Sequence, residues 1–116
     1  MIIISATLDF ATQADRDRAV AISAPIQQRT RDEEAACRSY CFAADPCVPT
    51  RIQVYELWDD EPGLAAHFKH ATYAAMVEAL RSVGITGTAN QMYQISAHEP
   101  VYDANGNARE KFFVGK

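Results

Sequence analysis

The sequence has no apolar run of the roughly 20 residues that a membrane span needs. Its apolar start, Met1 to Ile4, lacks a basic segment before it and turns polar by Asp9, so we expect no secretory signal and a cytoplasmic protein. Basic residues are also few: 11 Lys and Arg stand against 15 Asp and Glu, for a net charge of -4. A mildly acidic chain does not attract phosphate backbones, so neither nucleic acid nor a membrane is an expected partner.

Cysteine is equally sparse, and its spacing excludes two classes of site. An odd set of three, Cys37, Cys41 and Cys47, argues against a closed disulfide framework. The spacing lacks the paired cysteines of zinc sites, and no Ser-His-Asp set, Cys-His set or Gly-rich phosphate loop is visible. We therefore expect no metal ion and no bound cofactor, with Cys37 and Cys41 as small apolar residues on one face of a strand.

The 116 residues suffice for one domain with an ordinary core, and hydrophobic periodicity predicts its elements. The first strand is apolar on both faces, and the first helix has an apolar stripe that includes Ala19, Ile22 and Ile26. Pro25 should kink this helix or divide it, and Gly84 should end the second helix. The predicted strands cover residues 2–10, 37–44, 51–58 and 91–98, and the predicted helices cover residues 13–36 and 62–83.

This order, β-α-β-β-α-β, is the split arrangement of a ferredoxin-like α+β fold. Right-handed crossovers place both helices on one face of an antiparallel sheet, and the other face would be bare. Because large apolar surfaces are rarely left exposed, we expect a second copy of the chain to cover that face as a homodimer. We expect the domain to cover residues 1–100, and residues 101–116, which carry Phe112, Phe113 and Val114, to pack on the partner subunit.

A short motif begins at the end of the third predicted strand. Glu56 and Trp58 form a Glu-x-Trp pair, an acidic turn follows, His67 comes nine residues after the Trp, and Tyr73 comes six residues later. Together with the element order, this motif resembles the antibiotic biosynthesis monooxygenase family. The resemblance implies a dimeric α+β barrel, with members that oxygenate quinols, anthrones or related phenols using O₂ without metal or flavin, and others that degrade haem.

Two positions depart from that family pattern. The second His that is common five residues after the first is replaced by Thr72, and the haem-ligating His of the haem-degrading members is replaced by Val77. The resemblance therefore favours a cofactor-independent monooxygenase acting on a small aromatic substrate. A ligand-binding or stress-responsive dimer, and a cofactor-free isomerase or lyase, remain alternatives.

His67 is the candidate catalytic residue, because an imidazole exchanges protons near neutral pH. It lies at the border of the apolar stripe of the second predicted helix. The alternative to a catalytic role is a half-buried structural His that is bonded to a carboxylate such as Glu56. A flat ring would stack on an aromatic side chain, and Arg51 would neutralise a phenolate. The candidate substrate-binding residues are Arg51, Tyr55, Glu56, Trp58, Phe68 and Tyr73.

Overall fold

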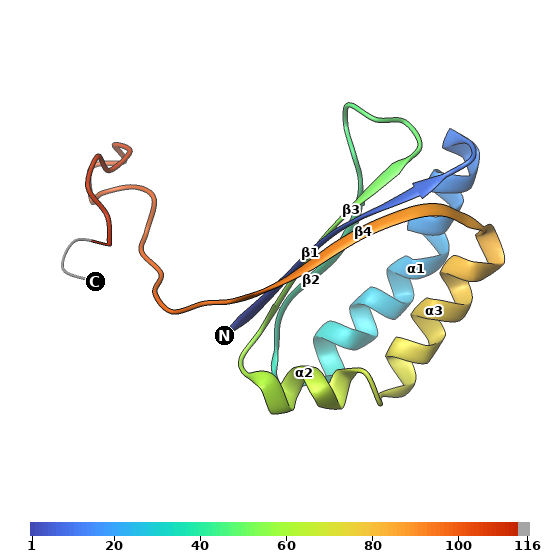
Figure 1. Ribbon diagram of the computed structural model, residues 1–116, viewed down its shortest axis with the longest axis horizontal. Coiled ribbons are helices and arrows are strands. Elements are labelled where there is room, and N and C mark those ends of the chain that lie inside the picture. Colours follow the sequence, from blue (N-terminus) through green and yellow to red (C-terminus); the bar gives the residue numbers. More distant parts are fainter. Residues whose placement is uncertain (114–116) are drawn as a thin grey trace.

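The computed structural model describes residues 1–113. The chain forms four strands and three helices (Figure 1). In order, they are β1 (Ile2–Phe10), α1 (Gln13–Glu33), β2 (Cys37–Ala44), β3 (Arg51–Trp58), α2 (Glu61–His67), α3 (Ala71–Val83) and β4 (Ile85–Gln94).

The strands form one antiparallel sheet in the order β2-β3-β1-β4, and the helices lie on one of its faces (Figure 1). This is the ferredoxin-like arrangement that the element order predicts. In the register of the sheet, Ile4 of β1 stands opposite Glu56 of β3 and Met92 of β4. Since side chains alternate along a strand, the even-numbered residues of these three strands face the helices.

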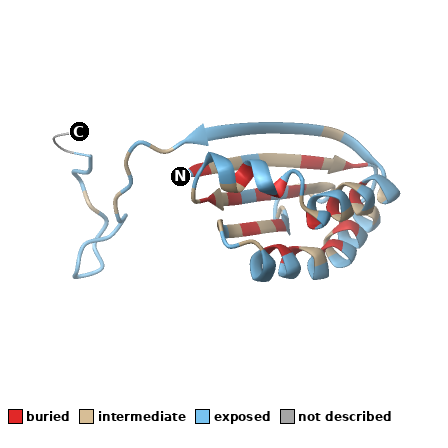
Figure 2. Ribbon diagram, turned by 90° about the horizontal axis from the view of Figure 1, so that it is seen from below, coloured by how far each residue is buried: buried red, intermediate tan, exposed pale blue. Residues whose placement is uncertain are grey.

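The core lies between the sheet and the helices. Ile52, Val54 and Trp58 of β3 are buried, as are Tyr40 and Phe42 of β2. These are all even-numbered residues, and the burial along β3 follows the alternation of side chains in a strand. β4 contributes little to this core, and Figure 2 shows it as mostly exposed.

The helix α1 covers the β2 side of the sheet and bonds to its outer edge. Gln27 Oε1 accepts from the Phe42 amide at 2.9 Å, and Gln27 Nε2 donates to the Phe42 carbonyl at 3.2 Å. Arg31 Nε donates to the Tyr40 carbonyl at 2.8 Å. The buried side chains of α1 are more polar than the predicted stripe: they are Arg16, Ala19, Ser23, Gln27 and Thr30. Ile22, predicted to face the core, is instead largely exposed.

Helix boundaries differ from the prediction at the end of the first helix and in the middle of the second. The helix α1 continues unbroken through Pro25 and ends at Glu33, since packing of its buried face holds both halves together. The predicted second helix is two helices, because His70 adopts an extended backbone and caps α3: its Nδ1 accepts from the Thr72 amide at 3.1 Å. Gly84 ends α3 as predicted, at a φ of 97° that favours glycine.

The last strand also has different bounds from those predicted. β4 begins at Ile85, directly after Gly84, and not at residue 91, because β1 is long enough to pair with the whole segment. Its end is set in the same way: Gln94 pairs with Ile2 and the Ile95 amide donates to the Met1 carbonyl at 2.9 Å, so β1 has no residue left to pair with residues 96–98.

Residues 95–113 leave the sheet as an arm that extends away from the helices (Figure 1). The radius of gyration is 16.3 Å, against about 13 Å for a compact chain of this length. The arm contains a turn in which Asp103 Oδ1 accepts from the amides of Asn105 and Asn107. The arm carries exposed apolar residues along its length: Val101, Tyr102, Phe112 and Phe113. Val114, part of the predicted contact, lies outside the described residues.

Candidate functional site

A cavity of about 380 Å³ lies between the sheet and α3. It exists because α3 packs mainly on α1, which itself covers the β2 side and leaves the β1–β4 side less covered. Thr88, Asn90 and Gln91 give β4 a polar wall, and Phe68 and Tyr73 line the helix side. The remaining lining is largely apolar and includes Ile4, Ala6, Leu8, Val54, Leu80 and Met92.

Glu56 is the ionisable side chain that β3 contributes to this cavity. It is only 7% exposed, and its Oε1 accepts a hydrogen bond from Trp58 Nε1 at 3.0 Å. Burial raises the pKa of Glu56 to about 7, with the Trp58 bond opposing this rise and the charge of Glu34 adding to it. A carboxyl with such a pKa exchanges protons at neutral pH.

Trp58 and His67 lie behind Glu56 and hold it in place, and we call these two residues the supporting layer of the site. The two rings lie 4.4 Å apart between centroids, and both side chains are almost completely enclosed. His67 Nδ1 is 2.8 Å from Glu34 Oε1, and because a carboxylate only accepts, Nδ1 carries the proton. Burial lowers the pKa of His67, and the hydrogen bond and charge of Glu34 partly offset this effect. The carboxylate partner of His67 is therefore Glu34, and not Glu56 as the sequence suggested.

Glu34 also connects the end of α1 to the start of α3. Its Oε2 accepts from Thr72 Oγ1 at 2.7 Å, so one carboxylate bonds to residues on both sides of the break between α2 and α3. Phe68 lies at this break, and its ring meets that of Tyr73 edge-on, with centroids 5.2 Å apart. The network thus fixes the helix junction that carries Phe68 and Tyr73 of the cavity wall.

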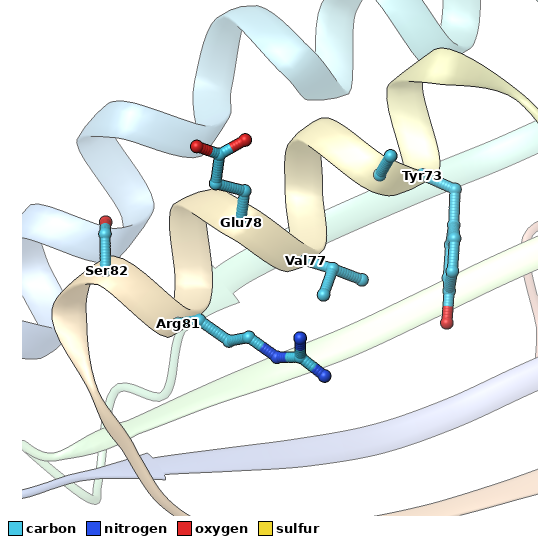
Figure 3. Close-up of a pocket in the computed structure, with 6 residues that line it drawn as sticks. Tyr73, Val77, Glu78, Arg81 and Ser82 are labelled. Carbon is cyan, nitrogen blue, oxygen red and sulfur yellow. The ribbon is translucent and has the colours of Figure 1, made fainter.

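Two further hollows adjoin the cavity. One, of about 440 Å³, shares Phe68 and Met92 with it and lies toward the N-terminus of the chain. The other, of about 580 Å³, is an open depression along α3 that shares Tyr73. Figure 3 shows Tyr73, Val77 and Arg81 of this depression pointing to the strand side of α3. Tyr73 therefore stands between the cavity and the open surface along α3.

The structure separates the predicted site residues into two groups. Glu56, Trp58, His67, Phe68 and Tyr73 lie together, with Trp58 and His67 in the supporting layer and the others in the cavity wall.

Arg51 and Tyr55 belong to the opposite face of the sheet. Arg51 Nε donates to Asp9 Oδ1 at 2.8 Å, and Tyr55 is exposed. Both are odd-numbered residues of β3, so the alternation of the strand separates them from Glu56.

Glu34, Thr72 and the polar residues of β4 were not among the predicted site residues. Glu34 is 33 residues from His67, and nothing in local periodicity links the two. Residues 85–90 of β4 lie outside the predicted strands, so the prediction did not include the alternation that places Thr88 and Asn90 in the cavity.

Within residues 1–113 no three His, Cys, Asp or Glu side chains gather in a way that would hold a metal ion. Over the same residues, no helix combines the length and apolar character that crossing a membrane requires.

Comparisons with known proteins agree with this architecture. A protein of Deinococcus radiodurans assigned to the antibiotic biosynthesis monooxygenases has a TM-score of 0.77 at 20% identity, over 89% of this chain and 100% of that one. A monooxygenase of Streptomyces coelicolor, solved with nanaomycin D, has a TM-score of 0.66 at 21% identity, over 85% and 91%. None of the curated proteins compared matches the sequence. The family profile described as antibiotic biosynthesis monooxygenase matches residues 1–79, and the chain therefore belongs to that family.

Proposed function

We propose that this protein is a cofactor-independent monooxygenase that oxidises a quinol, an anthrone or a similar aromatic phenol with O₂. The observation that carries the proposal is the cavity of about 380 Å³, which combines apolar walls with one buried carboxyl group. Small-molecule sites have about this size, beginning near 300 Å³, and place few polar groups in an apolar lining. Membership of the family and the similarity to a monooxygenase solved with nanaomycin D support the same class of reaction.

The chemistry balances without an added reductant. When an anthrone is oxidised, its methylene carbon loses two hydrogens and gains one oxygen atom of O₂ as a carbonyl. The second oxygen atom leaves as water with both hydrogens, so the substrate supplies all four electrons. The protein has to bind the ring, help to remove a proton and limit access of water. The side chain of Val77, at the position of the haem ligand in haem-degrading relatives, cannot coordinate iron.

The test is oxygen uptake by the chelator-treated protein with 1,8-dihydroxyanthrone, menadiol and 1,4-naphthohydroquinone. A monooxygenase should consume one O₂ per product, transfer one ¹⁸O atom from ¹⁸O₂ to the product and release no hydrogen peroxide. Peroxide in equal amount to product would indicate an oxidase instead. Conversion of the substrate without O₂ would indicate an isomerase or lyase, and binding without conversion would indicate a ligand-binding protein.

We also propose that the protein works as a homodimer, formed through the sheet face opposite the helices. Tyr55 and Tyr93 on this face are 44% and 53% exposed, and Ile3 and Leu57 lie between them on β1 and β3. Family members are typically dimeric, and a stable interface buries about 1,200 Å² or more in total. Light scattering should give the mass of two chains at micromolar concentration, and a mass of one chain would contradict the proposal.

A further inference from the structure

The carboxyl group of Glu56 has one engaged oxygen and one free oxygen. Oε1 is held by the indole N–H of Trp58 at 3.0 Å. Within residues 1–113, Oε2 has no hydrogen-bond partner and is not sealed off from the cavity. Because Oε2 is accessible and Glu56 lines the cavity, this is the carboxyl oxygen that can accept from a molecule bound there.

We propose that Glu56 Oε2 is the base that ionises the substrate in the cavity, which rests on the proposed oxygenase function. In this step a C–H bond of an anthrone, or the O–H bond of a phenol or quinol, breaks and an O–H bond forms on Oε2. The electron pair stays on the substrate, which becomes an anthrolate or phenolate. No electron leaves the substrate until this anion meets O₂, and the Glu56 proton is available for the water that forms later.

The surroundings of Glu56 suit a base that works near neutral pH. The ionisable groups around it are Glu34 from the end of α1, Cys37 and Tyr40 from β2, and His67 and Tyr73 from the helices. β1 and β4 line the cavity with uncharged residues. Burial and the negative charge of Glu34 raise the pKa of Glu56 to about 7, which places a useful fraction of carboxylate at neutral pH.

His67 is less well placed for direct contact with substrate. It is only 2% exposed, its Nδ1 is occupied by Glu34, and it is not among the cavity-lining residues. Its ring instead packs on Trp58, which holds Glu56 Oε1. We therefore assign His67 as a positioning residue: through Trp58 it holds the carboxyl group with Oε2 free.

A buried carboxylate also selects among substrates. An aromatic ring is accepted by the apolar wall of Ile4, Val54 and Leu80, whereas a substrate that carries its own carboxylate or phosphate would be repelled by Glu56. The expected substrates are therefore uncharged phenols, quinols or anthrones, with the ionisable group directed at β3.

The experiment separates proton removal from oxygenation. Under nitrogen, exchange of the methylene protons of 1,8-dihydroxyanthrone with D₂O is followed by NMR, with wild type, Glu56→Gln, Glu56→Asp and Glu78→Gln. Glu78 is exposed on α3, so its substitution controls for the loss of one negative charge. We expect wild type and Glu78→Gln to accelerate exchange, Glu56→Gln to lose roughly 10²–10⁴-fold, and Glu56→Asp to lie between them. Gln keeps the acceptor for Trp58, and a melting curve shows whether each variant folds.

The outcomes distinguish the two proposals. Catalysed exchange that needs Glu56, without O₂ uptake in air, would leave the base in place and refute the oxygenase. O₂ uptake and exchange that survive within a few-fold in folded Glu56→Gln would refute the base and leave the oxygenase. A wild type that accelerates neither exchange nor O₂ uptake with any of the three aromatic substrates would overturn both.

Discussion

Replacement of Glu56 by Gln should change how stability depends on pH, whether or not a substrate is known. The folded protein holds this carboxyl at a pKa of about 7, against an ordinary value of 4.5. Between these two pH values the unfolded chain releases the proton and the folded chain keeps it. The unfolded state then binds fewer protons, so the free energy of unfolding falls as pH rises through this interval.

The magnitude follows from the two pKa values. Each tenfold change in an ionisation constant is worth about 1.4 kcal/mol, so the shift from 4.5 to about 7 corresponds to about 3 kcal/mol. Glu56→Gln removes this contribution and keeps an oxygen for the Trp58 N–H. Relative to wild type, the variant should therefore gain about 3 kcal/mol of stability between roughly pH 4.5 and pH 7. For a domain of this size that is about 10 °C in melting temperature.

The assay is urea unfolding followed by the fluorescence of Trp58, the single tryptophan, which is fully buried beside Glu56. Wild type, Glu56→Gln and Glu78→Gln are compared at one protein concentration, because dimerisation would otherwise contribute. The difference between wild type and Glu56→Gln should widen from acidic to neutral pH and then level off. A difference that stays constant over this interval would refute the argument that burial holds Glu56 protonated.

The remaining predictions concern the role of His67, the close packing of Gly63 against Ala36, and the C-terminal arm. His67→Phe keeps a ring at its position but removes the N–H donor to Glu34, so it should lower the free energy of unfolding by about 1–3 kcal/mol. The pH midpoint of oxygen uptake should stay unchanged in this variant. A lost or shifted midpoint would place His67 in the proton transfer itself. Gly63→Ala would bring a Cβ to 2.3 Å from Ala36 Cβ, so urea unfolding should show a loss of about 1–3 kcal/mol, and an unchanged midpoint would contradict the packing. Deletion of residues 101–116 should lower the melting temperature or the dimer fraction, and a truncated protein with unchanged melting and mass would show that the arm does not stabilise the assembly.

Much of the fold was predictable because the sheet has a strict period of two. The alternation in β3 alone separates Glu56 and Trp58 from Arg51 and Tyr55, and burial confirms that separation. Carried one step further, it would have removed Arg51 and Tyr55 from the substrate-binding set. The information was present in the sequence, and only the assumption that the whole strand serves one site obscured it.

The rest depended on contacts that local patterns do not record. The break before α3 results from a single cap at His70, within a run of residues that otherwise favours one continuous helix. The start of β4 is set by the length of its partner β1, and not by its own Gly- and Thr-rich composition. The partner of His67 comes from the far end of α1, so this bond exists only once the layers have assembled.

The bonds between α1 and β2 bear on how copies of this chain can associate. The backbone groups of Phe42 and the carbonyl of Tyr40, which would otherwise be open to another strand, are occupied by Gln27 and Arg31. Within residues 1–113 the opposite edge, β4, has a strand neighbour only on its β1 side. Growth of a fibre by edge pairing needs two free edges on every chain. With one edge closed, such pairing ends after two chains have met, so the helix that completes the core also protects the protein from open-ended aggregation.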